Sequence, residues 1–242
     1  MNIMIQPTNK TTVSFLKKQN GISKYGSYVK MCYDAMVHLK AHKGYDVSED
    51  RLYERNYIIS LSYIMGKYDG ENDTMSGLIV GGDVNKYVFD HCLKTAEYEL
   101  EEIKETKMFL DFSDNYVAPD FLIHKNNKIR DVNEKCQKIV IEAKTKPSLK
   151  ENEFYRDFFK LNVYLSRLKF RYGIYLLINT SVSQINNYIK SYIDRGLYLS
   201  KKCKNRMLFL VHEKESEIPS LYVFKLDPIE YFKTKNDAYI IS

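Results

Sequence analysis

Three charged side chains border two neighbouring apolar segments in the middle of the chain. Asp120 precedes the apolar run 121–123, and Glu142 and Lys144 follow the apolar run 138–141. Side chains two apart on a strand share a face, so Glu142 and Lys144 would point the same way. If the two strands are adjacent, Asp120 comes beside Glu142. Two neighbouring carboxylates repel each other unless a cation lies between them. Oxygen ligands with open positions suit Mg²⁺, and a lysine beside that ion can orient a water or hold a phosphate.

These residues resemble the signature of the PD-(D/E)XK nuclease superfamily, the fold of most type II restriction endonucleases and of many repair and recombination nucleases. The Pro-Asp pair at 119–120 matches its first half, and the Glu-Ala-Lys run at 142–144 matches its second half. The resemblance extends more loosely to the order of elements over about residues 84–180. Because the motif is short, its meaning depends on structural context. The alternative is an edge hairpin that carries ordinary surface charges.

The spacing of apolar residues predicts an α/β fold with a mixed central β-sheet flanked by helices. Helices are expected over 27–43, 48–66, 84–106, 150–168 and 181–196. Strands are expected over 108–112, 119–123, 138–144, 170–180, 205–213 and 221–227, with a further short one at 78–80. From residue 84 the order begins helix, three strands, helix, strand, which matches the α-β-β-β-α-β core of restriction endonuclease-like folds.

The chain divides on this basis into two parts. Residues 1–82 are expected to form a mainly helical N-terminal extension, whose first 25 residues are an irregular arm or a short helix. Residues 83–242 would form the nuclease core with its C-terminal strands. The glycine-rich loop 67–83 is the boundary between the two parts, because its four glycines and several acids interrupt the helical pattern.

The resemblance implies a further acid on the first core helix, directed at the metal. Of the four glutamates between residues 97 and 102, Glu99 lies closest to the apolar stripe of its helix. A carboxylate at the margin of a buried stripe is costly without a partner, so Glu99 is the candidate. The alternative is a glutamate exposed to water. Glu54 on the earlier helix shares the face of Tyr57 and Leu61, and is the reserve.

The helix after the Glu-Ala-Lys run often carries a basic or amide residue in this superfamily, and some branches show Gln-x-x-x-Tyr there. Here Lys160 and Tyr164 lie one turn apart, with lysine in the place of glutamine. Lys146 follows the motif directly and could also touch a phosphate. These three residues are the candidate nucleic-acid contacts. For the two lysines the alternative is a solvated surface charge.

Composition excludes several other classes of protein. A hydrophobic fraction of 44% and a charged fraction of 28% are typical of a soluble globular protein. No apolar run approaches the roughly 18 residues of a membrane span, and the N-terminus lacks a signal-peptide layout. We therefore expect a cytoplasmic chain without a membrane partner.

The four cysteines are far apart in the sequence, which argues against a zinc site and against a disulfide framework. The net charge of +6 is compatible with nucleic acid without demanding it.

The resemblance implies a Mg²⁺-dependent nuclease, with Mn²⁺ as a substitute cofactor. Asp120, Glu142 and the backbone carbonyl of Ala143 would bind metal, and Lys144 would act on the attacking water. The expected substrate is double-stranded DNA, cut to leave 5′ phosphate and 3′ hydroxyl ends. A restriction-type endonuclease acting as a homodimer on a palindrome is the first expectation.

Three alternatives remain open. The first is an RNA endonuclease, or a transposition or repair nuclease, of the same fold. The second belongs to another class, a nucleic-acid-binding module that is catalytically silent. The third is an accidental motif in an unrelated protein, which predicts that Asp120 and Glu142 lie far apart.

Overall fold

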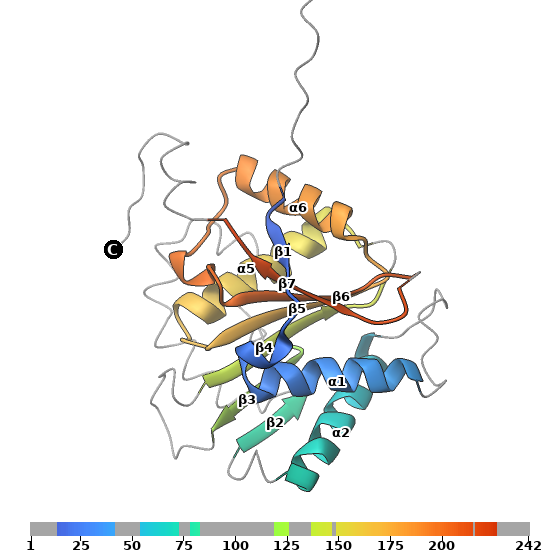
Figure 1. The fold of residues 1–242 in the computed structure, drawn as a ribbon. Helices are drawn as coiled ribbons and strands as arrows, with labels where there is room; N and C mark the ends of the chain where they lie inside the picture. The colour runs from blue at the N-terminus through green and yellow to red at the C-terminus, as the bar shows by residue number, and fades with distance from the viewer. Residues whose placement is uncertain are drawn as a thin grey trace, which may run out of the picture.

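The computed structural model describes residues 14–41, 54–72, 78–82, 119–125, 137–146, 149–214 and 216–226. These residues build one mixed β-sheet with helices against both faces (Figure 1). The expected α/β class and mixed central sheet are therefore confirmed.

Within the described residues seven strands form the sheet, in the order β1-β7-β6-β5-β4-β3-β2. Their bounds are β1 Leu16–Lys18, β2 Leu78–Gly82, β3 Phe121–Lys125, β4 Gln137–Lys144, β5 Tyr172–Ile178, β6 Met207–His212 and β7 Ser220–Phe224. β2, β3 and β4 are antiparallel neighbours, β4, β5 and β6 run parallel, and β7 and β1 complete the other edge in antiparallel fashion. The parallel strands β5 and β6 are continuous apolar runs because helices cover both of their faces.

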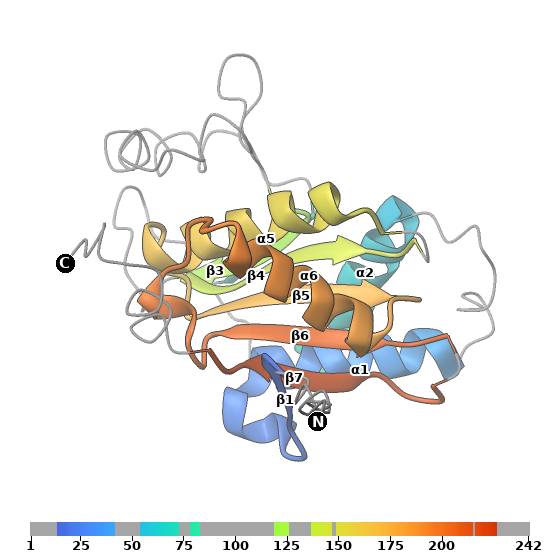
Figure 2. The same ribbon diagram turned by 90° about the horizontal axis from the view of Figure 1, so that it is seen from above.

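In the described part of the chain two pairs of helices enclose the sheet, α1 (Ser27–Ala41) with α2 (Glu54–Asn72) on one face and α5 (Glu151–Ser166) with α6 (Val182–Asp194) on the other (Figure 2). Two short 3₁₀ helices, η1 (Ile22–Tyr25) and η2 (Lys201–Cys203), lie in the connections. Alternate residues of each central strand enter the two cores, as the pleat requires. In β5, Tyr175 and Leu177 pack beneath α5, whereas Ile174 and Leu176 pack against the α1–α2 face.

The helix α5 is buried along most of its length. Glutamates in its first turn suit the positive end of the helix dipole. Aromatic contacts hold it in place: Phe154 stacks on Tyr175 at 5.3 Å between ring centroids, and Phe158 meets Tyr192 edge-on at 4.8 Å. Because α5 is fixed so firmly, the polar side chains that it buries are held in fixed positions as well.

The N-terminal residues that the structure describes join the same sheet and core as the rest. Leu16–Lys18 pairs with β7, which the sequence did not indicate, and β2 pairs with β3. The expected end of the second helix at Gly66 is wrong, because α2 continues to Asn72. A glycine inside a helix costs only about 1 kcal/mol relative to alanine, too little to end it. The helix expected over 84–106 and the strand expected over 108–112 lie outside the described residues.

Candidate active site

Strand pairing brings the two halves of the motif together. β3 and β4 are antiparallel neighbours with Phe121 opposite Ile141, so the residue before β3 meets the residue after Ile141. Asp120 is half-buried at that point, and its Oδ2 accepts a hydrogen bond of 2.8 Å from the backbone N–H of Ala143. Asp120 therefore lies beside the Glu142–Lys144 end of β4. This arrangement is the opposite of what an accidental motif predicts.

The pleat of β4 separates the charged residues from the apolar ones, as expected. Ile141 and Ala143 pack in the core beneath α1 and α2. Glu142 and Lys144 point to the other face, where both form ion pairs with side chains of α5. Glu142 is fully buried, whereas Lys144 retains partial exposure at the strand end.

Acidic and basic groups alternate in a chain of ion pairs across this face. Glu142 Oε2 lies 2.5 Å from Lys160 Nζ, which lies 3.1 Å from Asp157 Oδ1. The other oxygen of Asp157 is 3.1 Å from Lys144 Nζ, and Lys144 Nζ is 3.0 Å from Glu54 Oε1. Each lysine is thus held between two carboxylates, and the chain links β4 to α5 on one side and to α2 on the other.

The site contains more acidic than basic groups. With Asp120 it has four carboxylates and two lysines, a formal excess of two negative charges when all are ionised. Burial raises the pKa of Glu142 well above its ordinary value, and Asp120 and Asp157 raise it further against the opposing effect of Lys160. Burial is also the main cause of the raised pKa of Glu54. The site therefore favours a further positive charge, either a proton or a metal ion.

Both lysines remain protonated at neutral pH. Burial alone would lower the pKa of Lys144, but Asp157, Glu54 and Asp120 outweigh it and raise the pKa. The pKa of Lys160 is raised in the same way, chiefly by Glu142 and Asp157. Lys144 is therefore an ammonium that donates hydrogen bonds, including one of 2.9 Å to the carbonyl oxygen of Ala143.

The oxygen atoms present suit a hard divalent cation. Glu142 Oε1 is buried and has no hydrogen-bond partner among the residues that the structure describes. Asp120, Glu142 and the Ala143 carbonyl are the ligand types that Mg²⁺ prefers. In the described part of the chain no three His, Cys, Asp or Glu side chains form a ready-made ligand set. Lys160 already holds Oε2 of Glu142, so an ion held by Asp120 and Glu142 would use the unpartnered Oε1.

The other expected site residues fall into three groups. Glu99 lies outside the described residues, whereas the reserve candidate Glu54 contacts Lys144. Lys160 and Tyr164 are buried, so neither is a solvated surface side chain. Tyr164 is buried near Glu142, and burial followed by that carboxylate raises the pKa of its phenol well above the ordinary value. Lys146 is exposed just after β4.

Asp157 is a central member of the ion-pair chain that the sequence did not single out. It is buried on α5, and the hydroxyl of Tyr175 donates a hydrogen bond of 3.4 Å to its Oδ2. Its spacing of three residues from Lys160 places the two on one helix face. The sequence does contain a signal for Asp157, namely a charged pair at this spacing within a strongly apolar helix.

Comparison of the chain with protein-family models, with curated proteins and with solved structures gives no match. No helix in the described segments is long and apolar enough to cross a membrane.

Proposed function

We propose that this protein is a Mg²⁺-dependent nuclease that hydrolyses phosphodiester bonds in double-stranded DNA, in the manner of a restriction-type endonuclease. Mn²⁺ would substitute for Mg²⁺, and a homodimer would match a palindromic site. The observation that carries the proposal is the position of Asp120, which directly precedes β3 and lies beside Glu142 on the adjacent strand β4, with Lys144 on the same face of β4 as Glu142.

The order of the described elements supports a PD-(D/E)XK core. The succession α2-β2-β3-β4-α5-β5 reads helix, three strands, helix, strand, and β2, β3 and β4 are consecutive neighbours in the sheet. In this assignment α2 is the first core helix, in place of the helix expected over 84–106. Glu54 then takes the position of the upstream acid, and its contact with Lys144 is the observation that favours it over Glu99.

Asp120, Glu142 and the carbonyl of Ala143 are the groups that would hold the cation. When bound, a divalent cation lowers the pKa of a coordinated water and offsets negative charge on the phosphate. Lys144 is protonated, so its ammonium orients the attacking water or holds a phosphate oxygen by donating hydrogen bonds. The water oxygen bonds to phosphorus and releases a proton to solvent. The bond to the 3′ oxygen breaks, and that oxygen takes a proton from solvent.

The residues of α5 position this machinery. One oxygen of Asp157 contacts Lys144 and the other contacts Lys160. Asp157 therefore fixes the positions of both ammonium groups. Lys160 partners the buried charge of Glu142, which would otherwise be very costly. A single carboxylate of α5 thereby links Lys144 directly, and Glu142 through Lys160, into one chain of ion pairs.

The chain of ion pairs also supports a candidate from another class, a catalytically silent nucleic-acid-binding module. Lys144 and Lys160 each have two acidic partners in the protein itself. A buried network of this kind can serve structure alone. This candidate predicts binding of nucleic acid without cleavage.

The decisive experiment is incubation of wild-type protein with plasmid DNA and with single-stranded RNA, in millimolar Mg²⁺ and in EDTA. Asp120→Asn is the test variant, and Asp194→Asn is the matched control, because Asp194 forms an exposed pair with Lys190 on α6. We expect Mg²⁺-dependent DNA fragments from wild type and control, and none from Asp120→Asn. Cleavage of RNA alone would favour an RNA endonuclease of the same fold. Binding without cleavage would favour the silent module.

A further inference from the structure

Two neighbouring segments of this protein carry a cluster of basic residues. Segments 166–171 and 200–206 contain seven lysines and arginines and no aspartate or glutamate. We call this surface the basic corner; its members are Arg167, Lys169, Arg171, Lys201, Lys202, Lys204 and Arg206. The whole chain has a formal net charge of +6. The corner holds seven of the 37 lysines and arginines of the chain, with no acid in the same two segments to offset them.

Hydrogen bonds join the two segments into one rigid surface. The N–H of Gly173 donates to the carbonyl of Arg206 at 3.0 Å, and Lys202 Nζ donates to the carbonyl of Ser166 at 3.3 Å. Beneath them the fully buried Asn162 accepts hydrogen bonds from the N–H of Ser200 and from the thiol of Cys203.

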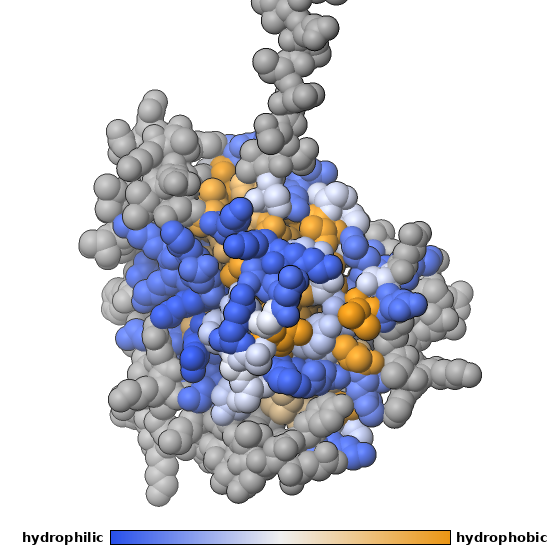
Figure 3. Space-filling view, viewed as in Figure 1, coloured by the Kyte–Doolittle hydropathy of each residue, from blue (hydrophilic) through white to orange (hydrophobic). Residues whose placement is uncertain are grey.

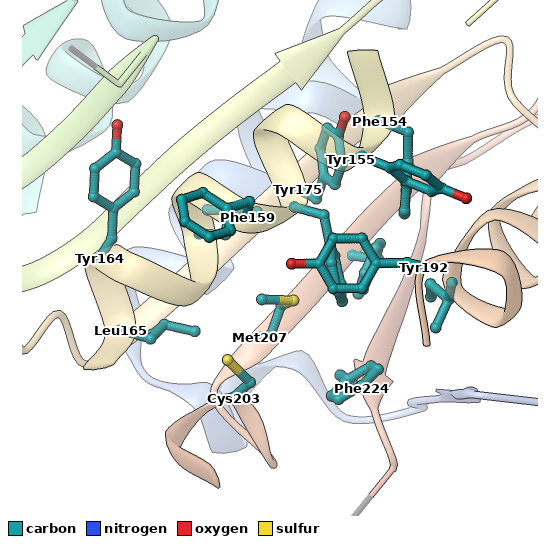
Figure 4. Packing of buried hydrophobic residues seen from close by; sticks show 14 of the residues in the cluster. Phe154, Tyr155, Phe159, Tyr164, Leu165, Tyr175, Tyr192, Cys203, Met207 and Phe224 are labelled. Atoms are coloured by element: carbon teal, nitrogen blue, oxygen red, sulfur yellow. The ribbon is translucent and has the colours of Figure 1, made fainter. Parts of the chain in front are cut away.

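The basic corner lies where α5 ends and where β5 and β6 begin. Figure 3 shows hydrophilic side chains gathered at the left of the view, over this side of the molecule. In Figure 4 Cys203 and Met207 lie close to Leu165 at the carboxyl end of α5, with apolar packing beneath the basic loops. Five of the seven basic residues are exposed, and Arg167 and Arg206 are half-buried.

So many like charges on two adjacent loops repel one another and attract an anionic polymer. A membrane-surface site would normally add exposed apolar anchors. In the described part of the chain the large exposed apolar side chains are Ile59, Tyr63 and Ile218, and none of them belongs to the basic corner. The composition of this surface therefore fits a phosphate backbone better than a lipid headgroup layer.

We propose that the basic corner binds the phosphate backbone of the nucleic acid beside the point of cleavage, an inference that rests on the proposed nuclease function. Lys160, which contacts Glu142, is six residues before Ser166 on the same helix. At a rise of about 1.5 Å per residue this is roughly 9 Å along the helix axis. That distance corresponds to about three nucleotide steps of a duplex strand. One helix thus connects Asp157 and Lys160, which position the charged groups of β4, to the surface that holds the substrate.

The test is the salt dependence of binding to a short labelled duplex, measured by fluorescence anisotropy without Mg²⁺. The test variant combines Lys201→Gln, Lys202→Gln and Lys204→Gln. The matched control loses the same charge on β1 and η1, through Lys17→Gln, Lys18→Gln and Lys24→Gln, at three exposed positions. A charge-conserving triple replacement of Lys201, Lys202 and Lys204 by arginine, with thermal melting of every variant, separates loss of charge from loss of folding.

We expect the slope of log K against log salt to fall in magnitude by roughly two to three in the test variant, since each phosphate contact contributes about 0.9. The arginine variant should keep the wild-type slope, and the lysine control should change it by much less. Equal effects of the two glutamine triples, or no effect of either, would overturn the proposal. Binding to anionic phospholipid vesicles that is lost in the test variant, with DNA binding unchanged, would overturn it in favour of a membrane.

The failure of this proposal is distinguishable from that of the proposed function. If wild type cuts DNA while the test variant keeps the wild-type salt slope, the proposed role of the basic corner is wrong and the proposed nuclease function is supported. If the slope falls as expected but no substrate is cut, the proposed role of the basic corner is supported and the proposed nuclease function is wrong.

Discussion

At the scale of single residues, Asp157 is the group on which the candidate site depends most. Its side chain is almost fully buried, and its two oxygens hold the ammonium groups of Lys144 and Lys160. Removing one partner of a buried ion pair leaves an uncompensated charge, whereas an exposed pair contributes little. The sequence predicted that Asp120, Glu142 and Lys144 lie together, because the alternation of side chains along a strand fixes which of them share a face. The sequence did not predict a role for Asp157, because a helical pattern does not indicate which strand residue a polar side chain of the helix contacts.

Replacement of Asp157 by asparagine should therefore lower the free energy of unfolding by about 3 kcal/mol. The buried Lys160 and the partly exposed Lys144 lose their shared carboxylate, whereas the shape of the side chain is kept. Urea unfolding at neutral pH measures the change. The exposed Asp194→Asn variant should change stability by less than about 0.5 kcal/mol. Equal stability of the two variants would contradict a structural role of Asp157.

Glu142 should make the stability depend on pH in a predictable direction. Burial raises the pKa of Glu142 in the folded protein above its ordinary value of 4.5. Its contribution to stability is therefore fully present below that ordinary value and is lost as pH rises through the raised pKa. We expect wild type to gain stability relative to Glu142→Gln as the pH falls from neutrality toward 4.5. Urea unfolding of both proteins at several pH values tests this; a constant difference, or a change of opposite sign, would refute it.

At the scale of elements, the local pattern of the sequence predicted α5, α6 and the central strands, because each buries one strong apolar face. It failed at Gly66, where helix packing outweighs the local cost of glycine, and at β1, whose pairing with β7 joins residues far apart in the chain. The close approach of α5 to β5 also depends on a glycine. A Cβ atom on Gly173 would lie 3.2 Å from Leu165 and 3.3 Å from Leu161, both buried.

Two glycine substitutions should consequently have opposite effects. Gly173→Ala should destabilise the fold by about 1 kcal/mol or more, because the two leucines of α5 must move. Gly66→Ala should stabilise it by roughly 0.5–1 kcal/mol, because that position is inside α2 and no atom lies within 4 Å of the added carbon. Thermal or urea unfolding measures both. Destabilisation by Gly66→Ala would indicate that the helix ends there, and a neutral Gly173→Ala would indicate looser packing of α5.

At the scale of the whole molecule, the sheet brings three distant regions to one site. Glu54 comes from α2, Asp120 and Glu142 from neighbouring strands, and Asp157 from the helix that follows. The α/β class and the β3–β4 pairing could be predicted from apolar patterns and the strand pleat. The sheet order and the basic corner could not, because both arise from contacts between segments far apart in sequence. The choice of Glu99 lies outside the described residues, and the contact of Glu54 with Lys144 favours the reserve candidate.

The most direct test of the central claim is the single-turnover rate of DNA cleavage by Lys144→Met in saturating Mg²⁺. Lys190→Met is the matched control, because Lys190 forms an exposed ion pair on α6. Loss of one charge-stabilising donor usually lowers such a rate by about 100- to 1,000-fold. We therefore predict a fall of that size in Lys144→Met with little change in DNA affinity, and the wild-type rate in Lys190→Met. Cleavage by Lys144→Met at the wild-type rate would contradict the assignment of this site.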